Sequence, residues 1–397
     1  MPALVDVIIP VYNGEKYLVD AVRSIQEQTV RDIRVIVVDD GSTDATPQIL
    51  EGLARSDARI SILTKPNSGI VDALNLALSD CSADFIARHD ADDLAYPDRF
   101  ETQLDYLNRR PDCVALSGVV RHIDARGEAI GSFGRLPPPE WADASFVPSI
   151  EPYLIHPFLM MRRSAAVAAG GYRHVLHSED TDLYWRLRER GKLHNLEQVL
   201  GDYRLHDESI SGGSLKNGRV MAISSQLSAI SARRRAAGAP DLKFDRRQNQ
   251  DLKDRSDSLE KLYDYAQADL DLEEKAHLRA ALSAKMLELA GYRPYEVALS
   301  DCSFMRSAAV EKLGALSAKN RAFLVRRYSG TVARLAYKGR WSEARALLWP
   351  EILPATLYRL AMRIIFPPSL RASVKKAGGQ RLDRLKNQVK SLVRQSA

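Results

Sequence analysis

Apolar and polar positions in the first ninety residues alternate in two different rhythms. Continuous β-branched runs at residues 5–11 and 34–38 predict buried strands. Each run is followed by a segment with apolar residues at helical spacing, residues 14–28 and 43–55. The scheme is then repeated, with a strand, a helix and a strand expected at 60–63, 68–78 and 85–87. This order predicts an α/β fold with right-handed crossovers and a mostly parallel, Rossmann-like sheet flanked by helices.

The second half of the chain has a different pattern. Beyond residue 214 the strand signals almost vanish, and runs such as 272–289 and 308–318 are rich in residues that favour helix. The sequence therefore predicts three parts. They are an α/β domain over residues 1–215, a C-terminal α-helical accessory domain over 216–358, and a basic amphipathic tail over 359–397.

The composition is that of a soluble globular protein. Of the 397 residues, 45% are apolar and 27% are charged, and this length is enough for two domains. Cys81, Cys113 and Cys302 have no metal-binding spacing, which indicates a reducing compartment. No uncharged apolar run approaches the ~18 residues of a membrane span, and Asp6 interrupts the first apolar run, unlike in a signal peptide. We therefore expect a cytoplasmic protein.

The net charge of +6 is concentrated in the tail, where residues 359–397 hold ten Lys or Arg and one acid. An apolar segment with two arginines (357–366) precedes a Pro-Pro pair and a basic segment with leucines at helical spacing (381–393). Two interpretations remain open. Either the tail packs on the helical domain with its basic face in solvent, or it lies on the anionic inner face of the membrane. Nucleic acid is disfavoured, because no aromatic residue interleaves the charges after Phe366.

Candidate chemistry begins with the segment RHDADD at residues 88–93, directly after the last of these expected strands. If its backbone is extended, Asp90 and Asp92 point to one side and Asp93 points to the other. Two carboxylates on one side repel each other unless a cation lies between them, and hard oxygen ligands suit Mg²⁺ or Mn²⁺. The alternative is a solvated acidic turn that caps the next helix.

A second polar cluster, VVDDGSTD at residues 37–44, follows the second expected strand. An acid at a strand end, such as Asp39, can accept a hydrogen bond from a nucleobase or from a ribose hydroxyl. The first strand ends in PVYNG at residues 10–14, which brings Tyr12 to the sheet edge where ligands of parallel sheets bind. For both segments the alternative is a simple strand-to-helix turn.

Together these motifs resemble the inverting family-2 glycosyltransferases of the GT-A fold. The resemblance covers roughly residues 4–212 and rests on several short segments in the family's order. They are PVYN at 10–13, VDDGS at 38–42, NSG at 67–69, ALN at 73–75, DADD at 90–93, GGY at 170–172, SEDTDL at 178–183 and YRLH at 203–206. The resemblance implies transfer of a sugar from a nucleotide sugar, expected to be a UDP-sugar. The implied acceptor is a hydroxyl of a glycan or a lipid-linked molecule, in the assembly of bacterial surface polysaccharide.

On the donor side, the resemblance implies that Asp39 holds the base, expected to be uracil. Tyr12 would line the base pocket, and Asp90 would face the ribose. The donor nucleotide-binding residues implied in this way are Pro10, Tyr12, Asp39, Asn67, Gly69 and Asp90.

The resemblance also implies a metal site and phosphate contacts. Asp92, with Asp90 and His206, would bind a Mn²⁺ or Mg²⁺ ion that neutralises charge on the leaving diphosphate. Phosphate contacts are expected from Arg88 and Arg204. The alternatives are a structural role for His206 and simple ion pairing of Arg88 with neighbouring acids.

On the acceptor side, the resemblance implies that Asp180 is the general base and that Glu179 helps to set the acceptor. One base and a direct displacement give inversion at the anomeric carbon without a covalent intermediate. The alternative is that Asp180 is only an acid at the N-terminus of a helix.

Two other functional classes compete with this interpretation. A sugar-phosphate nucleotidyltransferase would use a similar scaffold, but the first strand leads into PVYNG and not into a glycine-rich phosphate loop. A non-catalytic carbohydrate-binding protein could retain such a fold, but the four acids Asp39, Asp90, Asp92 and Asp180 are intact.

Overall fold

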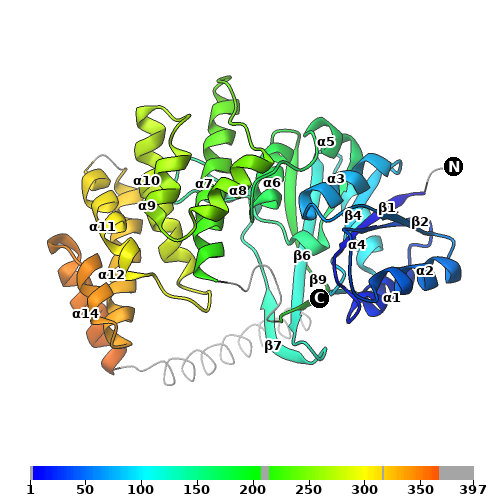
Figure 1. Cartoon of the computed structure of the whole chain (residues 1–397), viewed down its shortest axis with the longest axis horizontal. Helices are drawn as coiled ribbons and strands as arrows, with labels where there is room; N and C mark the ends of the chain where they lie inside the picture. The colour runs from blue at the N-terminus through cyan, green and yellow to red at the C-terminus, as the bar shows by residue number, and fades with distance from the viewer. Residues whose placement is uncertain (1–2, 207–213, 315–316, 366–397) are drawn as a thin grey trace, which may run out of the picture. The chain divides into compact units, whose positions relative to one another are not determined.

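The computed structural model describes residues 3–206, 214–314 and 317–365. Among the described residues, the chain divides into two compact units, one within residues 3–285 with 293–295 and the other within residues 286–292 with 296–365. Figure 1 labels their helices and strands. The domain limits expected at residues 215 and 358 stay a prediction.

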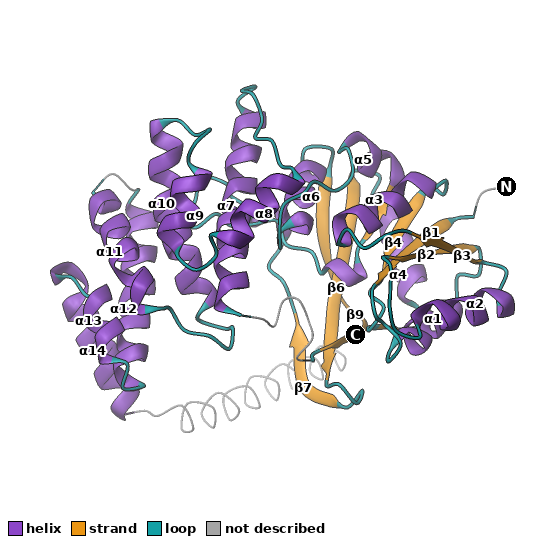
Figure 2. Cartoon of the chain, in the orientation of Figure 1, coloured by secondary structure: helices purple, strands orange, loops and turns teal. Residues whose placement is uncertain are grey.

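The first unit is built on a nine-stranded sheet with the strand order β3-β2-β1-β4-β8-β6-β9-β5, in which β7 pairs with β6 (Figure 2). The strands are β1 (Val5–Val11), β2 (Ile33–Asp39), β3 (Ile60–Thr64), β4 (Phe85–Arg88), β5 (Leu94–Ala95), β6 (Cys113–Ile123), β7 (Ala129–Gly134), β8 (Met160–Arg162) and β9 (Lys192–Arg204).

The sheet is parallel where the donor residues are expected and mixed elsewhere. Strands β1 to β4 pair in parallel, as the alternating sequence pattern predicts. Strand β8 is antiparallel to both β4 and β6, whereas β6 and β9 are parallel. The carboxyl ends of β1, β2 and β4 therefore meet at one edge of the sheet, where ligands of open α/β sheets bind.

Helices cover both faces of this sheet because its strands are apolar on both sides. In β1, Val7 and Ile9 pack with α1 (Leu18–Gln26), α2 (Thr46–Ser56) and α4 (Arg99–Arg109) on one face. Ile8 packs on the other face with α3 (Ile70–Asp80), α5 (Arg163–Ala168) and α6 (Glu179–Arg188). Fully burying such a side chain contributes about 1.5–3 kcal/mol. Two short 3₁₀ turns, η1 (Pro139–Trp141) and η2 (His156–Phe158), precede β8.

The described chain beyond residue 214 is helical, as the sequence predicts. The first unit continues with α7 (Leu215–Ala236), α8 (Arg246–Asp254), α9 (Leu259–Ala266) and most of α10 (Leu272–Leu289). The second unit contains α11 (Leu299–Leu313), α12 (Ala318–Tyr337), α13 (Trp341–Leu347), η3 (Pro350–Ile352) and α14 (Leu353–Ile365). Within the described ranges, no helix is long and apolar enough to cross a membrane. The expected tail lies outside the described residues from 366 onward.

Candidate active site

The end of β2 places Asp39 at the edge of the sheet. Asp39 lies beside Val11, the last residue of β1, and is 2% exposed. The backbone N–H of Ser42 donates to Asp39 Oδ1 at 2.9 Å, which fixes the carboxylate within a tight turn. Gly41 permits this turn with a φ of +74°, and a Cβ at this position would lie 2.8 Å from the backbone nitrogen of Asn67.

The neighbouring acid, Asp40, joins two turns of the chain. Its buried carboxylate accepts hydrogen bonds from the backbone N–H groups of Ser68 (3.0 Å) and Gly69 (2.8 Å), and it forms an ion pair with Lys65. The turn after β2 is therefore attached to the turn after β3. Asp40 is part of the VVDDGSTD motif, but the motif alone does not predict that Asp40 connects the two turns. The sequence feature that could have indicated this role is the second acid directly after Asp39.

A third turn, after β1, is bonded to the same assembly. The N–H of Asn13 donates to Ser42 Oγ at 2.9 Å, and the N–H of Thr43 donates to Asn13 Oδ1 at 2.8 Å. The N–H of Gly14 donates to Thr46 Oγ1 at 2.8 Å. These bonds hold the turns after β1 and β2 together.

The remaining donor candidates lie on these turns. Tyr12 is 51% exposed, so its ring is free to stack on a flat base. Pro10 pairs with Val38 in the sheet and is partly buried. Asn67 and Gly69 are exposed on the turn that Asp40 holds. The structure thus brings the expected nucleotide-binding residues of β1, β2 and β3 to one edge.

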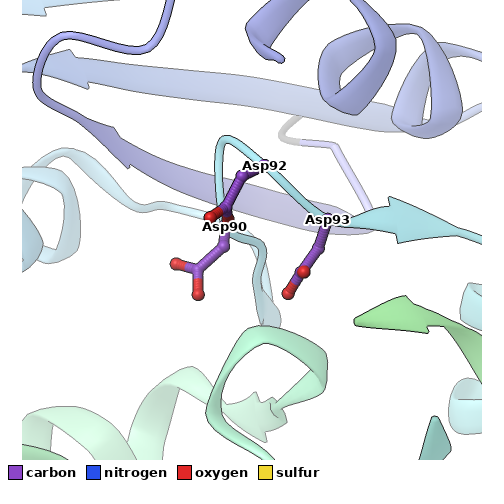
Figure 3. A group of neighbouring side chains, drawn as sticks. All are labelled: Asp90, Asp92 and Asp93. Atoms are coloured by element: carbon purple, nitrogen blue, oxygen red, sulfur yellow. The ribbon is translucent and has the colours of Figure 1, made fainter. Parts of the chain in front are cut away.

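The acidic segment after β4 is a turn and not the extended backbone that we expected. Ala91 and Asp92 form the turn, and oxygens of Asp90, Asp92 and Asp93 lie within 4.8 Å of one another. The three carboxylates lie on the same side of the loop (Figure 3). The expectation that Asp93 points away is therefore wrong: it is 1% exposed and accepts a 2.8 Å hydrogen bond from the backbone N–H of Arg204.

The end of β9 contributes a histidine and an arginine to this cluster. His206 Nε2 lies 2.8 Å from Asp92 Oδ2, and its ring lies 5.4 Å from that of Tyr17. Arg204 donates to the carbonyl oxygens of Asp92 (2.8 Å) and Asp124 (3.2 Å), and its guanidinium stacks on Tyr17 at 4.4 Å. Arg204 therefore supports the acidic loop, and its expected contact with phosphate stays a prediction.

Arg88, the last residue of β4, is a buried cation between two groups of acids. It is 3% exposed and forms an ion pair with Asp90. Its charge also counteracts the rise in the pKa of both Glu179 and Asp180. Its Nε and Nη1 atoms have no hydrogen-bond partner among the residues that the structure describes.

Glu179 and Asp180 begin helix α6, directly after its N-cap residue Ser178. Burial, and then the charge of Asp180, raise the pKa of Glu179, and Asp90 adds to this rise. Burial also raises the pKa of Asp180, although its Oδ1 accepts a 2.6 Å hydrogen bond from the N–H of Thr181. A carboxylate with a raised pKa is a stronger base, which suits general base catalysis near neutral pH.

A buried ion pair behind Asp180 was missed in the sequence. Glu151 and Lys285, each about 2–3% exposed, lie 2.9 Å apart, and Gln226 Nε2 donates to the same Glu151 oxygen at 3.3 Å. The charge of Glu151 contributes to the raised pKa of Asp180. No local pattern connects these residues, because they come from a loop and from helices α7 and α10.

The acidic cluster has the chemistry of a divalent cation site. Burial, and the charge of Asp92, raise the pKa of Asp90, even though Arg88 opposes the rise. Asp93 Oδ2 is buried and lacks a hydrogen-bond partner within the described part of the chain. Several hard oxygens close together, one of them unsatisfied, fit Mn²⁺ or Mg²⁺.

Comparison with known proteins identifies the family of the chain. The model of a family described as "Glycosyl transferase family 2" matches residues 6–168. EpsE of Bacillus subtilis, a protein assigned as a glycosyltransferase, is 33% identical over 219 residues, which cover 52% of this chain and 73% of EpsE. Chondroitin synthase of Escherichia coli is 30% identical over 209 residues, but the chain spans only 30% of its length.

A solved structure also resembles the chain. S. aureus TarS 1–349 in complex with UDP-GlcNAc has a TM-score of 0.49 and 16% sequence identity, covering 86% of this chain and 89% of that one. Such a distant likeness carries no inference about substrates. The mixed sheet flanked by helices agrees with the expected GT-A fold. The family match and the extent of the EpsE alignment show that the chain belongs to glycosyltransferase family 2.

Proposed function

We propose that the chain is a metal-dependent inverting glycosyltransferase that uses a nucleotide sugar, in the simplest case a UDP-sugar. The acceptor is a hydroxyl group of a glycan or of a lipid-linked molecule. One observation carries this proposal: Arg88 pairs with Asp90 of the acidic cluster and also acts electrostatically on Glu179 and Asp180. Groups suited to a leaving diphosphate and groups suited to a hydroxyl nucleophile therefore both lie within electrostatic range of Arg88.

On the donor side, the nucleoside would lie across the turns after β1, β2 and β3. Asp39 accepts a hydrogen bond from the base, and the exposed ring of Tyr12 stacks against it. Pro10 at the end of β1, and Asn67 and Gly69 on the turn held by Asp40, would complete the nucleotide-binding residues. Because one buried carboxylate holds that turn, the site is preorganised before the nucleotide arrives.

Asp90 and Asp92 would hold Mn²⁺ or Mg²⁺, with Asp93 and His206 beside them. When bound, such an ion supplies positive charge to the diphosphate as it leaves. The chain's own residues keep the loop in place. The side-chain Nε of Arg204 donates to the carbonyl oxygen of Asp92, and the backbone N–H of Arg204 donates to Asp93 Oδ1. Arg88, which also acts on Glu179 and Asp180, offsets the negative charge of Asp90.

On the acceptor side, Asp180 removes the proton of the attacking hydroxyl. The oxygen then bonds to the anomeric carbon as the bond to the diphosphate breaks, which inverts the configuration. Glu179, at the same helix end, orients the acceptor. The bond from Thr181 and the neighbouring charges of Arg88 and Glu151 hold Asp180 and set its basicity.

The setting of the reaction is proposed from the relatives. Chondroitin synthase is named for a polysaccharide, and this supports polysaccharide assembly as the process served here. A lipid-linked acceptor would require the enzyme to work at the inner face of the membrane, as a peripheral protein.

The experiment that tests the proposed function is a thermal-shift screen of nucleotide sugars in the presence of Mn²⁺. A donor that binds the native state stabilises it, by about 2.7 kcal/mol at a hundredfold excess over Kd. This stabilisation raises the melting temperature. Donors that bind are then assayed for hydrolysis and for nucleotidyl transfer. Release of nucleoside diphosphate supports glycosyl transfer, whereas formation of a nucleotide sugar from a triphosphate would refute it.

Asp39→Ala is expected to weaken binding of uridine nucleotides. The lost hydrogen bond to a charged acceptor is worth about 1.5–3 kcal/mol, which corresponds to an increase of about 10- to 150-fold in Kd. Isothermal titration calorimetry with UDP and Mn²⁺ measures this change. Tighter binding of a purine nucleotide by the wild-type chain would refute the assignment of uracil.

The raised pKa of Asp180 has a consequence for the pH profile. Asp180 must be ionised to accept a proton, so kcat/KM should fall as the pH drops through its pKa. Because burial raises that pKa, the acidic limb should lie clearly above pH ~3.9, the ordinary value for Asp. Initial rates at saturating Mn²⁺ between pH 4 and 9 measure the limb. A profile that stays flat down to pH 4 would assign the base to another group.

A further inference from the structure

The outer side of helix α14 is an exposed apolar surface. Five large side chains on it are 40–68% exposed, and their spacing places them on one side of the helix. This apolar stripe consists of Leu353, Leu357, Tyr358, Ile364 and Ile365. The opposite side holds Thr356, which is buried, and Arg359, which donates to Ser329 Oγ of α12 at 3.1 Å.

The stripe contains no charged residue, although α14 has two arginines. An isolated exposed leucine needs no explanation, but a run of large apolar side chains along one helix marks an interaction surface. With thirteen residues, α14 is about 20 Å long, too short to cross the ~30 Å hydrocarbon core of a bilayer. A helix with one apolar side that is too short to span the bilayer can instead lie in the interface.

The charge of the surrounding unit identifies the kind of partner. Residues 286–365 contain thirteen Lys or Arg and six acids, and residues 366–397, which continue from α14, contain eight and one. By contrast, residues 1–285 contain 36 Lys or Arg and 44 acids. The stripe thus belongs to a strongly basic part of an otherwise acidic chain, and an anionic partner complements it.

This charge distribution separates three occupants of the stripe. The chain's own segment 366–397 has leucines that could cover it, but that segment is as basic as the unit it would pack on. A second copy would likewise bring two basic units together. An anionic lipid surface satisfies both features, because it accepts apolar side chains in its interface and attracts Lys and Arg by about 1 kcal/mol each.

We propose that the apolar stripe of α14 docks on an anionic bilayer surface. The stripe supplies the apolar contact, and the excess of Lys and Arg within residues 286–365 supplies the electrostatic attraction. This proposal deepens the proposed function, on which its biological purpose rests, by naming the surface at which a lipid-linked acceptor would be met. The docking itself requires neither donor nor acceptor.

The test is co-sedimentation of the full chain with phosphatidylcholine vesicles that contain increasing amounts of phosphatidylglycerol. Binding should rise with the anionic fraction and weaken in 0.5 M salt, which screens the attraction. Leu357→Glu/Ile364→Glu should lower the partition coefficient by at least about tenfold. Leu357→Ser/Ile364→Ser, which leaves the net charge unchanged, should also bind less. Leu357 and Ile364 are both exposed, so the melting temperature of each double variant should stay near that of the wild type.

A matched control has the same change in charge on another helix of the same unit. Leu299 and Val310 of α11 are 51% and 49% exposed, and Leu299→Glu/Val310→Glu should lower binding far less than the variant of the stripe. Equal losses in the two glutamate variants, or wild-type binding by the serine variant, would overturn the proposal. So would a wild-type chain that does not bind anionic vesicles at low salt.

The other two occupants give distinct results. A second copy would appear as a dimer in sedimentation velocity that becomes a monomer in the serine variant. If the chain's own segment covers the stripe, Leu382→Ser/Leu385→Ser should increase vesicle binding. Either outcome overturns the proposal. Asp180→Asn should bind vesicles like the wild type, so failure of docking and failure of the catalytic proposal remain distinguishable.

Discussion

Asp180→Asn should lower kcat by about 10²–10⁴-fold while donor affinity stays nearly unchanged. The amide has the shape of the carboxylate but cannot accept the proton of the acceptor hydroxyl. Since the proposed donor contacts lie on the turns after β1, β2 and β3, the Kd for nucleoside diphosphate should change little. Steady-state kinetics and calorimetry on the same preparation separate the two effects.

Stability provides the control for this variant. The pKa of Asp180 is raised in the folded protein, so its ionised form costs stability at neutral pH, and a neutral amide removes that cost. The melting temperature of Asp180→Asn should therefore equal or exceed that of the wild type. Asp182, which is fully buried and pairs with Arg173 and Arg186, gives the contrast: Asp182→Asn should lower the melting temperature markedly. Near-normal turnover in a folded Asp180→Asn variant would place the base elsewhere.

Asp92→Ala should lower turnover by on the order of 10³-fold or more and weaken the binding of nucleoside diphosphate in Mn²⁺. Loss of a cation that stabilises a leaving diphosphate removes several kcal/mol of transition-state stabilisation. Calorimetry with UDP, in Mn²⁺ and in excess chelator, should show a large metal dependence for the wild type and little for the variant. Undiminished turnover of the wild type in chelator would exclude a required metal.

Asp93, the neighbouring acid, should matter more than it would in an extended backbone. An extended backbone would make Asp93→Ala mild, but Asp93 is buried within the cluster and accepts a hydrogen bond from Arg204. Its removal should therefore impair metal-dependent binding as well, and should also lower the melting temperature because the N–H of Arg204 loses its partner. A stable, fully active Asp93→Ala variant would contradict this.

The parallel part of the fold could be predicted from the sequence because β1, β2 and β4 are buried on both faces. Such strands read as continuous β-branched runs, and β1 to β4 begin and end within a few residues of the expected positions. The mixed part could not be predicted. Strands β5 and β8 are two and three residues long, and β6 pairs with the distant β9, so no local pattern identifies them.

The candidate site was predictable where chemistry follows directly from a strand end. Asp39 ends β2, and Asp90 and Asp92 lie in the turn directly after β4. The loop that contains Asp92 was assigned the wrong backbone, because two acids two residues apart fit both a strand and a turn. Part of the alternative interpretation was right: the segment is a turn, but β5 intervenes before the next helix begins at Arg99. The pair of Glu151 and Lys285 depends on tertiary packing alone, and sequence spacing cannot reveal it.

The carboxylate of Asp40 also has an evolutionary consequence. Because it bonds the turn after β2 to the backbone of Ser68 and Gly69, a substitution in either turn shifts the other. Changes in these two segments should therefore show epistasis, with double variants that depart from the sum of the single ones. A lineage that adopts a new nucleotide would be expected to alter both turns together. If Asp40 itself were replaced, the two turns could diverge independently.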